Sequence, residues 1–155
     1  MPVDLTSDEY FMGEALRQAR LAFEDDEVPV GAVIVHEQRI IARAHNQVER
    51  LKDATAHAEM LVLTAAAHAR GDWRLDGCTL FVTKEPCPMC AGALTLARVS
   101  RLVYGARDER AGAAGSVFNI PQQGGLNHVV SVMGGVREKE ARELLREFFR
   151  LKRHE

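Results

Sequence analysis

Hydrophobic positions switch between helical and strand-like spacing along the whole chain, and no repeat, linker or low-complexity segment interrupts them. The first helical stretch places apolar residues three or four apart, at Met12, Leu16, Ala19 and Phe23. Thr6 and Glu9 form a capping-box pattern just before it. The spacing therefore predicts a helix over residues 7–24 whose apolar side faces a sheet.

Two short runs rich in β-branched residues follow at 28–36 and 39–45, with a polar turn around Glu37 and Gln38 between them. This pattern predicts an antiparallel hairpin. The later segments predict, in chain order, a helix at 58–70 that ends at Gly71, a strand at 79–83, a helix at 88–99, strands at 102–104 and 129–133, and a helix at 137–152. The strands on either side of the helix at 88–99 are expected to run parallel, because a helical crossover joins them.

These elements define an α/β protein in three layers, with a mixed, mostly five-stranded sheet flanked by helices. At 155 residues the chain is expected to form a single domain, residues 1–155. A domain of this size buries roughly two-thirds of its unfolded surface, so it needs no disulfide support. The last helix carries an apolar side made of Ala141, Leu144, Leu145, Phe148 and Leu151.

The net charge is −2 and the isoelectric point is about 6.3. Such a balance argues against a protein that coats nucleic acid indiscriminately, because that mode of binding uses many contacts from lysine and arginine to phosphate. A local basic patch is still compatible with it. Residues 146–154 carry four Arg or Lys residues against one Glu, so we expect the patch at this end of the chain.

The three cysteines are odd in number, and two of them form a metal-type pair. The longest apolar stretch, residues 28–35, contains Pro29 and Gly31 and is far shorter than the roughly 20 residues of a membrane-spanning helix. No apolar segment near the first residues resembles a secretory signal. We therefore expect a soluble protein of the reducing cytoplasm, with no membrane partner.

Two short motifs together supply the ligands of a catalytic zinc site. His57, Cys87 and Cys90 can fill three tetrahedral positions and leave the fourth open for water. Glu59 is not needed as a ligand, so it is the candidate proton carrier. The residues predict one Zn²⁺ per subunit and a hydrolytic reaction.

The spacing within each motif predicts where it lies on its helix. Cys87 and Cys90 are three residues apart and converge on one face of a turn, and Pro88 suits the first helical position. His57 and Glu59 are two apart and would point in nearly opposite directions on a regular helix. His57 is therefore expected at the very start of its helix, before regular geometry begins.

Other interpretations of these cysteines and histidines stay open. The Cys-x-x-Cys pair alone could be a redox pair, although the sequence around it lacks the thioredoxin-like context. A structural zinc would need a fourth ligand, and His128 or Cys78 could supply one. Cys78 precedes an apolar strand, so burial in the core is the better interpretation of this residue.

The chain resembles the tRNA-specific adenosine deaminases of bacteria, within the cytidine deaminase-like fold. The resemblance covers about residues 7–153 and is carried by Glu27-Val-Pro-Val-Gly-Ala-Val, Asn46, Thr55-Ala-His-Ala-Glu-Met, Glu85-Pro-Cys-Pro-Met-Cys-Ala-Gly-Ala, Tyr104-Gly-Ala-Arg-Asp, Gly112-Ala-Ala-Gly-Ser, Asn127-His and Phe148-Phe-Arg. Cytidine, deoxycytidylate and guanine deaminases share the zinc motifs. The downstream segments resemble the RNA-acting branch.

This resemblance implies hydrolytic deamination of adenosine to inosine at the wobble position of a tRNA anticodon loop, by a homodimer. It places Asn46 and Asn127 near the flipped nucleotides, and it gives Asp108 the role of accepting a hydrogen bond from a ribose 2′-hydroxyl. A solvated loop acid is the alternative interpretation of Asp108. The residues expected to shape the base pocket are Val28, Ala58 and Pro86. The helix at 91–97, expected to be exposed, is the candidate subunit contact.

The last helix offers further candidate RNA contacts. Phe149 fits core packing and base stacking equally well. Arg150, Lys152 and Arg153 are expected to contact phosphate, with a solvated helix end as the alternative.

Two departures from the family pattern keep a second substrate open. Lys84 stands before Glu-Pro-Cys, where an apolar residue is expected in much of the family, and Pro88 within the cysteine motif also occurs in guanine deaminases. A free purine base deaminase such as a guanine deaminase is therefore the alternative enzyme. A non-catalytic, zinc-stabilised RNA-binding subunit is the alternative of another class, and the presence of Glu59 argues against it.

Overall fold

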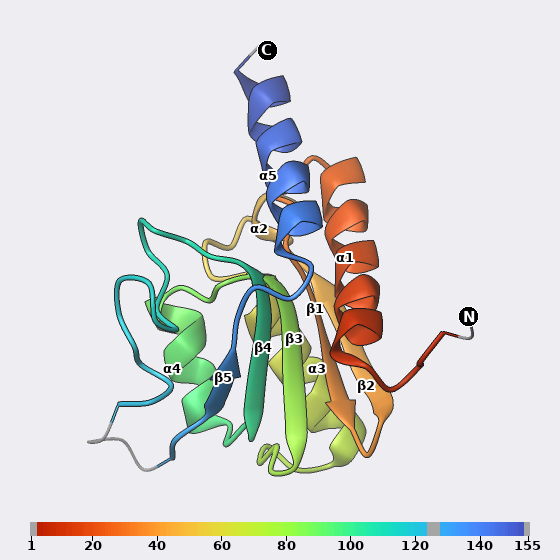
Figure 1. The fold of residues 1–155 in the computed structure, drawn as a ribbon, viewed down its shortest axis with the longest axis vertical. Helices are drawn as coiled ribbons and strands as arrows, with labels where there is room; N and C mark the ends of the chain where they lie inside the picture. The colour runs from red at the N-terminus through yellow and green to blue at the C-terminus, as the bar shows by residue number, and fades with distance from the viewer. Residues whose placement is uncertain (1–2, 124–127, 154–155) are drawn as a thin grey trace.

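Five strands form one mixed sheet within residues 3–123 and 128–153, the parts of the chain that this computed structural model describes (Figure 1). They are β1 (Gly31–His36), β2 (Arg39–His45), β3 (Cys78–Lys84), β4 (Arg101–Ala106) and β5 (Ser131–Met133). Their order across the sheet is β2-β1-β3-β4-β5. The β1–β2 and β1–β3 pairs are antiparallel, while β3–β4 and β4–β5 are parallel. The predicted hairpin and the predicted parallel pair are both confirmed.

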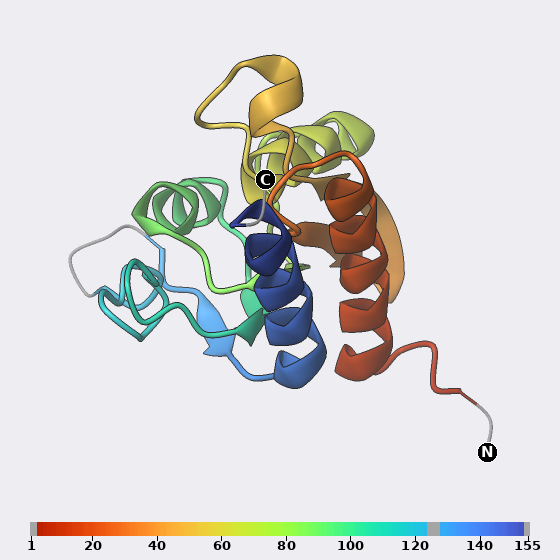
Figure 2. The same ribbon diagram turned by 90° about the horizontal axis from the view of Figure 1, so that it is seen from above.

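Helices cover both faces of the sheet, as Figure 2 shows from above. They are α1 (Asp8–Glu24), the single turn α2 (Val48–Leu51), α3 (Ala58–Arg70), α4 (Pro88–Leu96) and α5 (Glu138–Lys152). α1 and α5 lie on one face, and α3 and α4 lie on the other. The three-layer α/β architecture predicted from the sequence is therefore confirmed. Among the described residues, no helix combines the length and the apolar character needed to cross a membrane.

Alternation along the central strands divides the core into two layers. Ile34, Leu80 and Leu102 are fully buried in the layer that contains α3 and α4. Val33 and Phe81 are buried in the layer that contains α1 and α5. Successive side chains of a strand point to opposite faces, so each central strand is apolar on both sides because helices cover both.

The first helix begins one residue later than its capping-box pattern predicts. Ser7, not Thr6, is its N-cap, and the Ser7 hydroxyl accepts a hydrogen bond from the backbone N–H of Tyr10. Thr6 instead donates its hydroxyl to the carboxylate of Asp4. The capping-box prediction was wrong in its residues because the Asp4 side chain provides a local partner that holds Thr6 outside the helix.

Two further predicted elements differ by three residues at one end. β1 starts at Gly31, not at residue 28. α4 ends at Leu96, not at residue 99, and the chain then turns at Arg98, which has a φ of 63°. Helix 91–97 was expected to be exposed, but Ala91, Leu94 and Thr95 are buried and Leu96 is its one exposed residue, so that expectation was wrong for most of the helix.

One end of the sheet gathers the elements that carry the candidate chemistry. β3 and β4 both run toward this end, and α3 and α4 both start there (Figure 1). In open α/β sheets, ligands bind beyond the carboxyl ends of parallel strands. The fold therefore positions the two predicted metal motifs at the end of the sheet that is suited to a site.

Candidate metal centre and substrate groove

Two helix starts bring the three predicted metal ligands together. His57 is the N-cap of α3 and Cys87 is the N-cap of α4, with Pro88 at the first helical position. The Nδ1 atom of His57 lies 3.6 Å from Cys87 Sγ and 3.4 Å from Cys90 Sγ. The expectation that His57 stands at the very start of its helix is confirmed.

These distances fit a tetrahedral zinc ion. With Zn–N and Zn–S bonds of about 2.0–2.1 and 2.3 Å, two ligands of a tetrahedron lie about 3.6 Å apart. The three ligand atoms all lie within 4.8 Å of one another, and they form the one such three-residue group of the described chain. One nitrogen and two sulfur ligands are the donors that zinc prefers.

The three side chains of this cluster share protons through hydrogen bonds. A hydrogen bond from Cys90, with a second from His57, lowers the pKa of Cys87 to about 3. The hydrogen bond to Cys87 and burial raise the pKa of Cys90. The hydrogen bond to Cys87 also raises the pKa of His57, against the effect of its partial burial. A divalent ion would take the place of these shared protons.

Glu59 lies in the first turn of α3, two residues after His57, and its side chain is almost fully buried. Burial is the largest influence on the pKa of this carboxyl and raises it. Glu59 and the ligands His57 and Cys87 line the same groove. A buried carboxyl that opens onto a metal centre is suited to carrying protons.

The groove has a volume of about 1040 Å³ and lies at this end of the sheet. The sequence-predicted residues that line it are Val28, Asn46, His57, Glu59, Cys87, Asp108 and Phe149. Ala58 and Pro86, also predicted to shape the pocket, are buried and are not among the residues that line it. The Pro86 carbonyl accepts a hydrogen bond from Ala113. Asn127 lies outside the described residues.

Asn46 joins the groove to the start of α3. Its side-chain oxygen accepts a hydrogen bond of 2.7 Å from the backbone N–H of Ala58. This bond satisfies one of the free N–H groups at the helix start. Because the oxygen is used in this way, the N–H₂ group is the part of the amide that can serve a ligand.

Asp108 is held firmly rather than solvated. Its Oδ1 atom accepts hydrogen bonds from the backbone N–H groups of Arg110 and Ala111, and its Oδ2 atom lies 3.3 Å from Lys84 Nζ. Partial burial would raise the pKa of this carboxyl, but the Arg110 hydrogen bond and the Lys84 charge together hold it below its ordinary value. Asp108 is therefore an ordered anion at the edge of the groove.

Two buried carboxylates that organise the site are not among the sequence-predicted residues. Glu85 accepts hydrogen bonds from the backbone N–H groups of Asp108, Ala114 and Ser116 and from the Ser116 hydroxyl. Gly112 fits against this carboxylate, since a Cβ at residue 112 would lie 2.5 Å from it.

Glu27 plays the same part for α2. Its two oxygens accept the backbone N–H groups of Glu49 and Arg50. In the sequence, Glu27 lies two residues before a proline and Glu85 directly precedes one. An acidic residue at the border of an apolar run was the sequence signal that could have pointed to both carboxylates.

Only some of the predicted contacts on α5 line the groove or the space next to it. Phe148 and Phe149 both line the groove, Phe148 as a buried side chain and Phe149 as one that is 44% exposed. Arg153 lines a hollow next to the groove. Arg150 lines neither of these two spaces, and its guanidinium donates two hydrogen bonds to Glu147. The structure thus brings Phe149 and Arg153 to the site but not Arg150.

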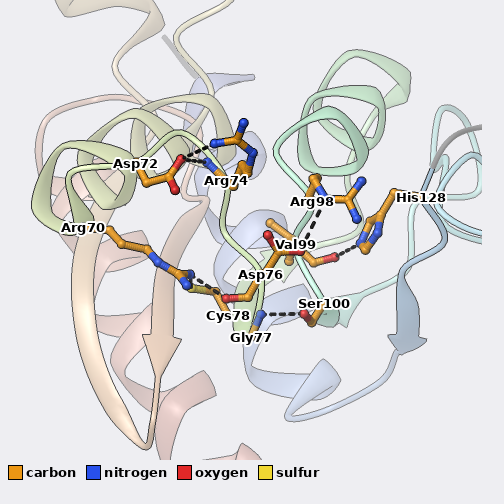
Figure 3. A network of polar contacts seen from close by, with 10 residues as sticks. All are labelled: Arg70, Asp72, Arg74, Asp76, Gly77, Cys78, Arg98, Val99, Ser100 and His128. Atoms are coloured by element: carbon orange, nitrogen blue, oxygen red, sulfur yellow. Dashed lines mark hydrogen bonds and ion pairs between the residues drawn. The ribbon is translucent and has the colours of Figure 1, made fainter.

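Cys78 and His128, the alternative fourth ligands, belong to a separate polar network at the start of β3 (Figure 3). Cys78 is fully buried, and its sulfur accepts a hydrogen bond from Arg70. The His128 ring donates to the Val99 carbonyl at 2.7 Å. Neither residue belongs to the described metal-ligand group, which leaves the fourth position open.

Comparison with known proteins gives the class of this fold and site. A family model described as MafB19-like deaminase matches residues 6–153. The guanine deaminase from Nitrosomonas europaea is 30% identical, with a TM-score of 0.80, over 96% of this chain and 87% of that one. The fold is thus the cytidine deaminase-like fold, and the class is that of the deaminases.

Relatives of higher sequence identity show the family within the deaminases. The tRNA-specific adenosine deaminase of Bacillus subtilis (strain 168) is 50% identical over 146 residues, 94% of this chain and 91% of that protein. A structure solved in studies of A-to-I editing by tRNA:A34 deaminases at the wobble position of transfer RNA is 47% identical, with a TM-score of 0.85, over 88% of this chain and 99% of that one. The chain belongs to the family of tRNA-specific adenosine deaminases.

Proposed function

We propose that this protein converts adenosine to inosine at the wobble position of a tRNA anticodon loop. One observation carries the proposal: a buried Glu59 lines one groove with His57 and Cys87 of the metal-ligand group, in a chain 50% identical to a tRNA-specific adenosine deaminase. The ligand set fits one Zn²⁺ per chain. When bound, zinc would polarise a water and lower its pKa from about 15.7 to near 7.

The residues of the chain then move the protons. Glu59 accepts a proton from the water that attacks C6 of adenine and delivers it to the ring nitrogen N1. It then carries a second proton from the hydroxyl now on C6 to the exocyclic amine; the C6–N bond breaks, ammonia leaves, and the C6 carbonyl of inosine forms. The burial of Glu59 suits this role, since a raised pKa lets the same carboxyl accept and return a proton.

Asn46 and Asp108 would hold the nucleotide. The free N–H₂ group of Asn46 can donate to an acceptor on the flipped base or its sugar. Asp108 is already fixed by backbone hydrogen bonds, so it can accept a hydrogen bond from a ribose 2′-hydroxyl without further ordering. Asn127, Phe149 and Arg153 stay as proposed RNA contacts. A loop adenosine suits this site because its extrusion costs less than extrusion from a duplex.

A free purine base is the second candidate substrate, because the Nitrosomonas europaea guanine deaminase shares the fold at 30% identity. The higher identity to tRNA-specific adenosine deaminases favours RNA. The non-catalytic alternative, a zinc-stabilised RNA-binding subunit, gives no role to the buried Glu59. A homodimer and a cytoplasmic location are proposals that rest on family resemblance.

The test is a deamination assay on an anticodon stem-loop RNA with a wobble adenosine, run beside free adenosine, adenine, guanine and cytidine. We expect inosine in the RNA and no turnover of the free compounds. Glu59→Gln should bind zinc and form no inosine. Turnover of a free base with the RNA untouched would overturn the substrate, and turnover by Glu59→Gln would overturn the proton carrier.

A further inference from the structure

A second hollow adjoins the groove and has a different chemical character. Its volume is about 630 Å³, and it is lined by Lys84, Asp108, Arg110, Phe149, Lys152 and Arg153. Four of these residues also line the groove, so the two spaces are continuous. We call this space the cationic hollow, because four of its six lining residues are Lys or Arg.

The groove itself is unfavourable for phosphate. Acidic residues outnumber basic ones along its lining, and they include the exposed Asp25 and Glu49 as well as the buried Glu59. Like charges repel most strongly where little water separates them. A neutral base can enter such a groove, whereas the charged groups on either side of that base are favoured in the cationic hollow.

Lys84 and Lys152 are the two cations that line both spaces, and Lys84 is the one beside Asp108. It is the last residue of β3, three positions before Cys87, and its side chain is 34% exposed. Its ammonium lies 3.3 Å from Asp108 Oδ2, and this contact occupies one of its three N–H donors. Asp108 is fixed on its other oxygen by two backbone N–H groups, so it holds the ammonium at the border of the groove.

Phe149 and Arg153 complete the hollow from the side of α5. Phe149 is 44% exposed, although the preceding Phe148 is buried, so its ring is available to a flat ligand. An aromatic face beside several cations is the arrangement that proteins use for single-stranded nucleic acid, where bases stack and phosphates meet Lys or Arg.

We propose that the cationic hollow binds the phosphodiester group next to the reacting nucleoside, with Lys84 as its phosphate ligand and Asp108 as the counter-ion that orients Lys84. This inference rests on the proposed function and gives it a basis for selectivity. A free purine base has no phosphate and gains nothing from the hollow. Lys84, the residue that departs from the family pattern, thus favours a polynucleotide over a free base.

The experiment removes either the negative charge of one phosphate in the RNA or the positive charge of Lys84 in the protein. Stem-loop RNAs are prepared with one uncharged methylphosphonate linkage each, at successive positions around the target adenosine, and kcat/KM for deamination is measured. For the wild-type protein we expect a loss of about tenfold at one position beside the adenosine, the size of a lost charge-assisted contact. Lys84→Met should lose about tenfold on the unmodified RNA and nothing further at that position. Lys84→Arg should recover most of the loss.

Lys139→Met is the matched control, since Lys139 is exposed on the first turn of α5 and lies outside both spaces. It should respond to each neutral linkage as the wild type does. Additive losses at every position would overturn the inference and leave Lys84 as a partner of Asp108 alone. Equal wild-type activity on all linkages would overturn it too, without any variant. Failure of the wild type to deaminate the unmodified RNA would instead overturn the proposed function, and the inference with it.

Discussion

The carboxylate of Glu85 is the hydrogen-bond acceptor that holds the loop after β4. It accepts hydrogen bonds from three N–H groups and one hydroxyl between residues 108 and 116, and it is 2% exposed. Buried polar groups are costly unless they are paired, so this loop depends on the carboxylate and the carboxylate depends on the loop. These hydrogen bonds fix the position of Asp108.

Glu85→Gln should therefore destabilise the protein and impair the site together. A glutamine keeps the shape but loses the charge and one acceptor, so we expect the free energy of unfolding to fall by about 1–3 kcal/mol. Deamination should fall further than the unfolded fraction explains, because Asp108 loses its support. Urea unfolding and kcat/KM measure the two effects. Glu37→Gln is the control, since that side chain is 84% exposed; equal results for both variants would contradict the role of Glu85.

The proposed set of metal ligands can be tested directly by substituting two cysteines. Cys90→Ala removes a predicted ligand, so we expect the zinc content to fall well below one per chain. Cys78→Ala should retain zinc, because Cys78 is bound to Arg70 at the other end of β3, and it should cost about 1 kcal/mol of stability from a small cavity. Metal analysis of purified proteins decides. Full zinc occupancy in Cys90→Ala would remove Cys90 from the ligand set.

At the scale of single residues, the sequence predicted the metal ligands but not Glu85, the buried carboxylate that holds the neighbouring loop. His57, Cys87 and Cys90 are recognisable because metal chemistry limits the residue types and the spacing. Glu85 is not, because its partners lie 23 to 31 residues later and are backbone groups, which leave no pattern in the side chains.

Among the elements, the start of α5 is joined to α1 by Arg137. Arg137 is the N-cap of α5 and has a φ of 52°, in the left-handed region. Its guanidinium donates two hydrogen bonds to Glu140 and one to the backbone carbonyl of Glu9. The start of α5, and with it the line along which Phe149 approaches the groove, is fixed by this contact.

This attachment should be sensitive to acid. The hydrogen bond and charge of Arg137 hold the pKa of Glu140 below its ordinary value. A carboxyl whose pKa is lowered on folding stabilises the protein fully above its unfolded pKa, about 4.3, and loses that contribution as the pH falls through the lowered folded value. The difference in Tm between wild type and Glu140→Gln should thus be constant from pH 7 to about 5.5 and shrink below about 4.5.

Glu143→Gln, which changes an exposed residue of the same helix, is the control. Thermal unfolding at each pH provides the measurement. A Tm difference between wild type and Glu140→Gln that stayed constant down to pH 3 would mean that the Arg137 contact does not contribute to folding.

Element prediction succeeded where periodicity is long and failed where it is short. The helix at 58–70 was predicted to the residue, since its apolar pattern and the glycine after it agree. The turn α2 was not predicted, because four residues carry no period and the turn is fixed by Glu27 from 22 and 23 residues earlier. Phe149 was ambiguous because the register of one helix decides which of two adjacent rings is buried.

For the whole molecule, the net charge of −2 conceals an uneven distribution. Carboxylates dominate the groove, while Arg or Lys side chains dominate the adjoining cationic hollow. Binding to RNA should therefore depend on a few cations at one end of the sheet. Few contacts give a shallow dependence of affinity on salt.

Substitution of two arginines of α5 can distinguish defined phosphate contacts in the cationic hollow from a general electrostatic attraction of RNA to the basic end of the helix. Arg153 lines the cationic hollow, so Arg153→Ala should lower the slope of log affinity against log salt by about 0.7, the value of one single-strand phosphate contact. Arg150 is paired with Glu147 and lines neither the groove nor the cationic hollow, so Arg150→Ala should change the slope by less. Lys139→Ala should leave it unchanged. Stem-loop binding between 50 and 300 mM salt provides the slopes. Equal decreases for Arg150 and Arg153 would indicate diffuse attraction to the helix end, because a defined phosphate contact in the cationic hollow involves Arg153 and not Arg150.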